Sequence, residues 1–142
     1  MTDPSPRTTA PLIPTMRYAD APAAIDWLCR AFGFTQHLVV PGEAGTIAHA
    51  QLTLGNGMIM VGSHRDDEYG AMQKLPAHVG GVCTQSVYVV IDDADAHHAR
   101  AAKAGAVVVV ELTEPDYGGK MYSCRDIEGH LWSFGTYDPW VS

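Results

Sequence analysis

The chain has 142 residues, of which 46% are hydrophobic and 18% are charged, and its formal net charge is −7. A disordered or collagen-like chain would show few apolar residues or a regular glycine spacing, so this composition indicates a single folded globular domain. The nine Lys and Arg residues are scattered, and no apolar run reaches the roughly 18 residues of a membrane helix. We therefore expect neither a nucleic-acid partner nor a membrane partner.

The N-terminus and the cysteines bear on where the protein works. Residues 1–10 carry no charged-then-apolar signal pattern, so we expect a flexible tail there. Cys29, Cys83 and Cys124 are odd in number and lack Cys-x-x-Cys spacing. Such thiols are typical of a reducing compartment, and we expect a cytoplasmic protein.

An apolar strand at 12–18 opens the first structural unit. Asp20 then suits the N-cap of a helix over about 21–32, and Gly33 stands where a C-terminal glycine belongs. An Asn-Gly pair predicts a tight hairpin between the last two strands of the unit. The strand-like runs after the helix are 34–40, 47–54 and 58–62.

The same order of elements returns after a long connection, 63–85. A strand at 86–91 leads to Asp93, the N-cap of a helix over about 94–104. The connection is longer than an ordinary loop, which indicates a lid or the edge of a site. The strand-like runs after the second helix are 106–112, 120–126 and 130–136.

An internal repeat explains this order. At an offset of 73 residues Asp20 falls on Asp93, and "GMIMVG" at 57–62 falls on "HLWSFG" at 130–135. The sequence therefore predicts an α+β fold with tandem βαβββ units. We place both units in one domain, with unit one at 11–62, the connection at 63–85 and unit two at 86–138, so that the domain spans 11–138.

The end of the chain carries a family resemblance. The duplicated units and "RDIEGHLWSFGT" at 125–136 resemble the vicinal oxygen chelate superfamily of glyoxalases, bleomycin-resistance proteins and dioxygenases, and its PhnB-like branch in particular. The pattern departs at Ile127, where that family usually has proline. The resemblance implies curled, half-open mixed sheets (the glyoxalase/bleomycin-resistance fold), pairing into a homodimer, and a concave face that holds a small molecule or a metal.

The resemblance also implies where a metal would bind. Carrying the four ligand positions of the metal-using members onto this chain gives Ile13, Met60, Ser86 and Ser133. None of these is the imidazole or carboxylate that divalent ions prefer. We therefore expect no metal cofactor. This expectation argues against glyoxalase and dioxygenase activity, because both reactions depend on a metal ion as a Lewis acid or oxygen activator.

Side chains alternate along a strand, so residues in phase with those four positions share the concave face. His49 is the sharpest candidate because an imidazole can move protons or hold an anion near neutral pH, although a wall residue without a chemical role fits it as well. No residue is assigned a catalytic role. The expected ligand-binding residues are His49, Gln51, Met58, Met60, Ser86, Tyr88, Met121, Ser123, Arg125 and Ser133.

Other polar residues receive simpler interpretations. His97 and His98 are adjacent on a helix, lack the i, i+4 spacing of a metal pair, and are expected on the solvated surface. Lys120 follows two glycines, where a bend would offer its cation to an anionic ligand or a hairpin turn would explain the glycines equally well. Trp132 and Phe134 are out of phase with Ser133 and should pack in the core.

Three functions remain open. The first is a metal-independent protein that binds a small molecule and sequesters an aromatic or antibiotic-like ligand. The second is a glyoxalase-like lyase or isomerase with a divalent metal at a non-standard site, held by His49 and carboxylates of the connection. The third is a dimeric partner module whose hollow is filled by Met and Leu side chains, which predicts no open cavity of ligand size.

Overall fold

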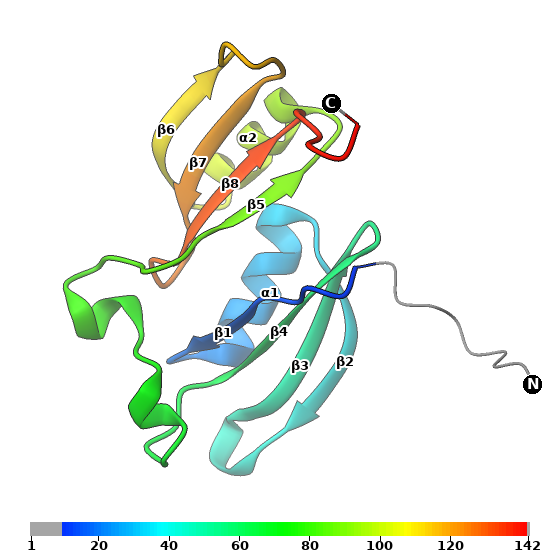
Figure 1. Ribbon diagram of the computed structural model, residues 1–142. Coiled ribbons are helices and arrows are strands. Elements are labelled where there is room, and N and C mark those ends of the chain that lie inside the picture. Colours follow the sequence, from blue (N-terminus) through cyan, green and yellow to red (C-terminus); the bar gives the residue numbers. More distant parts are fainter. Residues whose placement is uncertain (1–9, 142) are drawn as a thin grey trace, which may run out of the picture.

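The computed structural model describes residues 10–141, so nearly all of the expected flexible tail lies outside the described residues. Figure 1 shows the two units one above the other, with β1 and β5 at the centre and residues 63–85 looping around one side. The main elements are β1 (Thr15–Tyr18), α1 (Ala21–Phe32), β2 (Thr35–Pro41), β3 (Ile47–Leu54), β4 (Gly57–Ser63), β5 (Val87–Val90), α2 (Ala94–Lys103), β6 (Val107–Thr113), β7 (Met121–Arg125) and β8 (Leu131–Gly135).

The two units have the same topology. The strand order is β1-β4-β3-β2 in one sheet and β5-β8-β7-β6 in the other. β1 runs parallel to β4, and β5 runs parallel to β8, whereas the other neighbours are antiparallel. The predicted α+β fold of two mixed, unclosed βαβββ sheets is confirmed.

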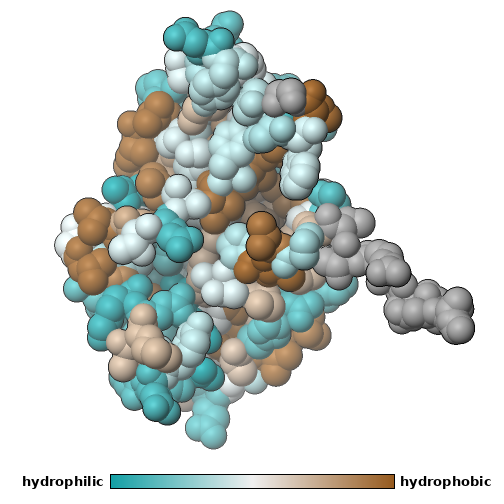
Figure 2. All heavy atoms as spheres, in the orientation of Figure 1, coloured by the Kyte–Doolittle hydropathy of each residue, from teal (hydrophilic) through white to brown (hydrophobic). Residues whose placement is uncertain are grey.

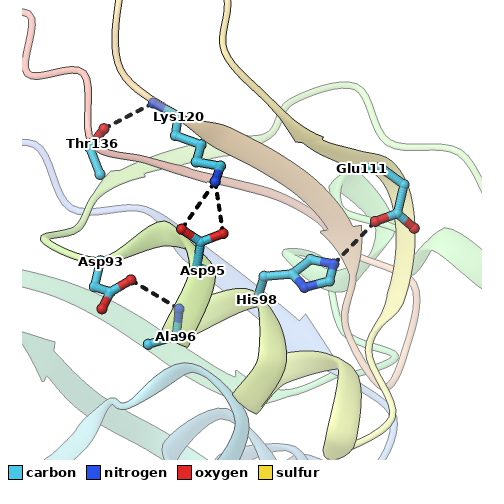
Figure 3. A network of polar contacts seen from close by, with 7 residues as sticks. All are labelled: Asp93, Asp95, Ala96, His98, Glu111, Lys120 and Thr136. Atoms are coloured by element: carbon cyan, nitrogen blue, oxygen red, sulfur yellow. Dashed lines mark hydrogen bonds and ion pairs between the residues drawn. The ribbon is translucent and has the colours of Figure 1, made fainter.

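Local signals in the sequence set the helix boundaries. Asp20 Oδ1 accepts a hydrogen bond from Ala23 N at 3.2 Å, and Asp93 does the same for Ala96 N at 3.0 Å (Figure 3). Gly33 ends α1 in the left-handed conformation, with φ 91°. No helix in the described part of the chain is long and apolar enough to cross a membrane.

The hairpin between β3 and β4 differs from the predicted one in its turn residues. Leu54 pairs with Gly57, so Gly55 and Asn56 form the two-residue loop, and Gly55 takes the positive φ of 58°. The predicted Asn-Gly pair was therefore shifted by one residue, because glycine at either of two neighbouring positions can supply the required backbone conformation.

One hydrophobic core joins both units. Phe32 at the end of α1 packs against Trp132 and Phe134 of β8, with ring centroids 5.2 and 4.7 Å apart. Trp132 and Phe134 are fully buried, as predicted. Trp27 of α1 donates its indole N–H to Ala104 O just after α2, at 2.7 Å. The helices of the two units therefore pack together on one side of the sheets.

The charged turn between β7 and β8 binds unit two to unit one. The buried carboxylate of Asp126 accepts hydrogen bonds from Tyr18 Oη at 2.6 Å and Trp132 Nε1 at 3.0 Å. Glu128 accepts from the backbone N–H groups of Ala19 and Asp20, at 2.7 and 2.8 Å, and so places negative charge at the start of α1. This turn therefore fixes how the two units meet.

The structure corrects the prediction for His97. Its Nε2 donates to Phe32 O at 3.0 Å, its Nδ1 accepts from Tyr122 Oη at 2.6 Å, and its ring lies 4.1 Å from that of Phe134. The surface prediction was wrong because contact with α1, 65 residues away in the chain, leaves no periodic signal in the sequence. His98 is partly exposed and contacts Glu111 at 3.2 Å.

We expect His97 to make the free energy of unfolding decrease in acid. Burial lowers the pKa of His97; the hydrogen bond to Phe32 O opposes this change, and the charge of Arg100 adds to it. A lowered folded-state pKa favours the neutral ring, so its contribution is complete above the unfolded pKa of about 6.5 and declines as the pH falls below that value. We expect urea denaturation to show this loss in the native protein.

The His97→Gln variant is expected to be less stable at pH 8 and to lose stability less steeply between pH 7 and pH 5 than the native protein. His37→Gln is the matched control, because His37 is exposed on β2, and it should keep the native slope. Equal slopes for His97→Gln and the native protein would contradict the assignment.

Candidate ligand-binding site

Each sheet has a face turned away from the helical core, which we call the open face. In unit one the pairing register places Gln51 opposite Met60 and Thr53 opposite Met58. Alternate residues of β3, Ala50 and Leu52, are fully buried in the core. The open face of unit one therefore comprises Thr15, Arg17, Leu38, Val40, His49, Gln51, Thr53, Met58 and Met60.

The open face of unit two follows the same parity. Ser123 pairs with Ser133, which in turn lies beside Tyr88 on the parallel strand β5. The two serine hydroxyls lie 2.7 Å apart, so that one donates a hydrogen bond to the other, and Ser123 is buried. The open face of unit two therefore comprises Tyr88, Val90, Val107, Val110, Met121, Ser123, Arg125, Leu131 and Ser133.

A groove of about 910 Å³ lies between the units. Residues 12–16, which lead into and include part of β1, form one wall, and residues 84–88, which do the same for β5, form the other. The connection closes one side through Met72, Val79 and neighbouring residues. The groove therefore has mainly apolar walls and the size of a small-molecule site, and the connection lies at its edge.

A smaller hollow of about 190 Å³ adjoins the groove at Thr15 and Met16, which line both. Arg17, His49, Met60 and Tyr69 also line it. His49 Nε2 lies 2.9 Å from Gln51 Oε1, an oxygen that accepts the N–H of the ring. The hollow therefore combines a guanidinium and an imidazole with thioether and aromatic walls.

The structure divides the predicted ligand-binding residues among several places. Ser86 and Tyr88 line the groove, and His49 and Met60 line the smaller hollow. Arg125 donates to Gly129 O at 3.0 Å, and Met121 Sδ accepts from Tyr117 Oη at 3.5 Å. Gln51, Met58, Ser123 and Ser133 lie on the open faces but line neither the groove nor the hollow.

Arg17 is the residue of this region that the sequence analysis missed. Its position in β1 next to Met16 and Tyr18, both buried in the core, gives it the parity of the open face. Strand alternation from the predicted run 12–18 would have included it. The prediction followed only the metal-ligand position at Ile13 and so did not follow the phase further along the strand.

The four positions implied by the metal-using relatives carry side chains that are poor ligands for a divalent metal: Ile13, Met60, Ser86 and Ser133. The residue beside Met60 on β1 is Thr15, two residues beyond Ile13, and the residue beside Ser133 on β5 is Tyr88, two beyond Ser86. In the described residues no three His, Cys, Asp or Glu side chains are grouped so that they could hold a metal ion. These side chains do not fit a divalent metal, which prefers carboxylate and imidazole ligands.

Lys120 does not supply a cation to the open face. Its Nζ pairs with the Asp95 carboxylate of α2, at 2.9 and 3.1 Å, and its backbone N–H bonds Thr136 Oγ1 (Figure 3). This pair raises the pKa of Lys120. Of the two interpretations of this position, the hairpin turn therefore fits the structure better, since the Lys120 side chain turns toward α2.

Comparisons of the sequence and of the structure with known proteins point to the same superfamily. The sequence model of the Glyoxalase/Bleomycin resistance protein/Dioxygenase superfamily matches residues 12–134. The uncharacterized protein Mb0911c of Mycobacterium bovis is 32% identical over 124 residues, which are 87% of this chain and 81% of that protein. The crystal structure of TioX from Micromonospora sp. ML1 is 36% identical, with a TM-score of 0.69 over 87% of this chain and 93% of that one. A glyoxalase-related enzyme from Fulvimarina pelagi, 14% identical with a TM-score of 0.61 over 87% of this chain and 84% of that one, shares the fold.

Proposed function

The chain belongs to the glyoxalase/bleomycin resistance protein/dioxygenase superfamily, and from this premise we propose that it binds a small organic molecule without a metal. Bleomycin-resistance members act by sequestration, in which no bond is broken. The aromatic and apolar character of the walls favours an aromatic or antibiotic-like ligand. The final-strand motif further supports a place in the PhnB-like branch, and three free cysteines support a reducing, cytoplasmic location.

One observation carries this proposal: the groove of about 910 Å³ has a ligand-sized volume, and among the described residues no three His, Cys, Asp or Glu side chains are grouped so that they could hold a metal ion. The partner-module hypothesis predicted that Met and Leu side chains would fill the hollow, and an open groove of this size opposes it. The surroundings of His49 do not favour the metal-dependent lyase, because its ring bonds the amide oxygen of Gln51 rather than a carboxylate.

Native mass spectrometry of protein purified without chelators tests the proposal. We expect a dimer without a stoichiometric divalent ion, and the same spectrum would detect a small molecule carried from the cell. Addition of EDTA should leave the melting temperature unchanged. A stoichiometric divalent ion that disappears in the His49→Ala variant would instead establish the metal-dependent lyase as the better hypothesis.

We also propose that the protein is a homodimer, because the open faces present apolar side chains to solvent. Leu38 and Val40 of β2 are 44% and 40% exposed, and Val107 and Val110 of β6 are 59% and 45% exposed. Figure 2 shows hydrophobic atoms gathered at the upper left, where β6 lies. Exposed apolar side chains gathered on an open face in this way favour an interaction site there.

Val110→Asp is expected to convert the dimer to a monomer, since a buried charge without a partner strongly opposes association. Size-exclusion chromatography with light scattering would measure the mass. The matched control is Val141→Asp, because Val141 is 81% exposed and lies outside both open faces; this variant should remain dimeric. A native protein that is monomeric at all concentrations would contradict the proposal.

A further inference from the structure

Within residues 10–141, neither the groove nor the smaller hollow is lined by an acidic side chain. The chain contains 16 Asp and Glu residues against nine Lys and Arg, yet in the described part of the chain no acidic residue lines either one. Lys74 lines the groove, and Arg17 and His49 line the hollow. Although the protein is acidic overall, the described residues that line the groove and the hollow therefore include cationic or ionisable nitrogen groups and no carboxylates.

Arg17 has unused hydrogen-bonding capacity. A guanidinium carries five N–H donors, but among the described residues its one hydrogen bond runs from Nη1 to Ser63 O at 3.2 Å. No carboxylate of residues 10–141 forms an ion pair with it. The hydrogen bond from Gly70 N and, to a smaller extent, the charge of Arg17 lower the pKa of Asp67. The carboxylate of Asp67 is bonded instead to Arg65 Nε at 3.0 Å and to Gly70 N at 2.9 Å.

The guanidinium is held in a fixed place. Its Cζ lies 5.5 Å from the centre of the Tyr69 ring, a cation–π contact. A Cβ atom at Gly62 would lie 2.7 Å from Nη1, so the absence of a side chain there leaves room for the guanidinium against β4. The hollow of about 190 Å³ beside it would accept a small oxyanion group, and planar guanidinium groups bind carboxylates and phosphates through paired hydrogen bonds.

We propose that the ligand is an amphipathic organic anion, whose oxyanion group binds Arg17 in the smaller hollow while its apolar body occupies the adjoining groove. Thr15 and Met16 line both spaces, so one molecule can extend from one into the other. This inference rests on the proposed function and narrows the class of ligand. Positive charge in a partly dehydrated hollow favours anions over neutral molecules of the same shape.

Two fluorescent probes of similar shape test this inference: 8-anilino-1-naphthalenesulfonate, which is anionic, and N-phenyl-1-naphthylamine, which is neutral. In the native protein both should bind. Arg17→Gln is expected to weaken the sulfonate about tenfold, as loss of a charge-assisted hydrogen bond does, and to change the neutral probe by less than about twofold. Gly62→Ala, which keeps the charge but displaces the guanidinium, should also weaken the sulfonate selectively.

Lys103→Gln is the matched control, because it removes the same charge at the end of α2 and lines neither the groove nor the hollow. Its affinity for both probes should equal that of the native protein. If both probes bind but Arg17→Gln behaves like Lys103→Gln, or weakens both probes equally, the anion inference fails and the proposed function stands. If neither probe binds the native protein, the proposed function fails as well. Unchanged binding of the neutral probe shows that each variant is folded.

Discussion

Asp126→Ala is expected to lower the free energy of unfolding by about 3–5 kcal/mol, the largest effect of any single polar substitution that we foresee. The carboxylate is 4% exposed and accepts four hydrogen bonds. Two of the donors, Tyr18 Oη and Trp132 Nε1, belong to side chains with no exposed surface, so the variant would leave them buried without their acceptor. Burial and the nearby Asp126 charge raise the pKa of Tyr18, which keeps its hydroxyl a donor.

Urea denaturation at neutral pH measures this loss. Asp126→Asn should cost less than Asp126→Ala, because the amide keeps an oxygen acceptor at the same place. Asp26→Ala is the control for removing a carboxylate: Asp26 is 77% exposed by its side chain and pairs with Arg30 on the helix surface, so its effect should stay within about 0.5 kcal/mol. An Asp126→Ala protein as stable as Asp26→Ala would refute the role of this turn in joining the units.

Phe32→Ala, as a separate variant, is expected to lower the free energy of unfolding by about 3–5 kcal/mol, because it removes a buried ring from the contact between α1 and β8. The side chain is 1% exposed and also packs against Trp27, with ring centroids 5.0 Å apart. The cavity would open where the two units meet. We therefore expect thermal unfolding to become less cooperative as well as to begin at a lower temperature.

Differential scanning calorimetry would show both changes. Tyr117→Ala is the control for losing an aromatic ring, because Tyr117 is 59% exposed in the loop before β7, and its melting temperature should stay close to that of the native protein. A single sharp transition in Phe32→Ala at the native temperature would mean that the two units do not depend on the shared core.

The sequence by itself determined the features that depend on near neighbours in the chain. Asp20 and Asp93 cap their helices because a side-chain oxygen needs to reach only three residues ahead. Strand parity placed His49 and Met60 on the open face of the first sheet and Trp132 on the core face of the second, because the side-chain period of two is a property of the extended backbone. The 73-residue repeat then predicted two such units.

Only the tertiary structure decided which of these surfaces meet. His97 became a half-buried contact of Phe32 O, and Lys120 turned toward Asp95, although neither outcome is visible in the local pattern. Arg17 lies on the predicted face but acquires its place from Gly62 and Tyr69, 45 and 52 residues farther along the chain. The physical reason is that propensity and alternation act over one turn or one strand, whereas the charge, burial and partners of a site depend on groups that folding brings together from distant parts of the chain.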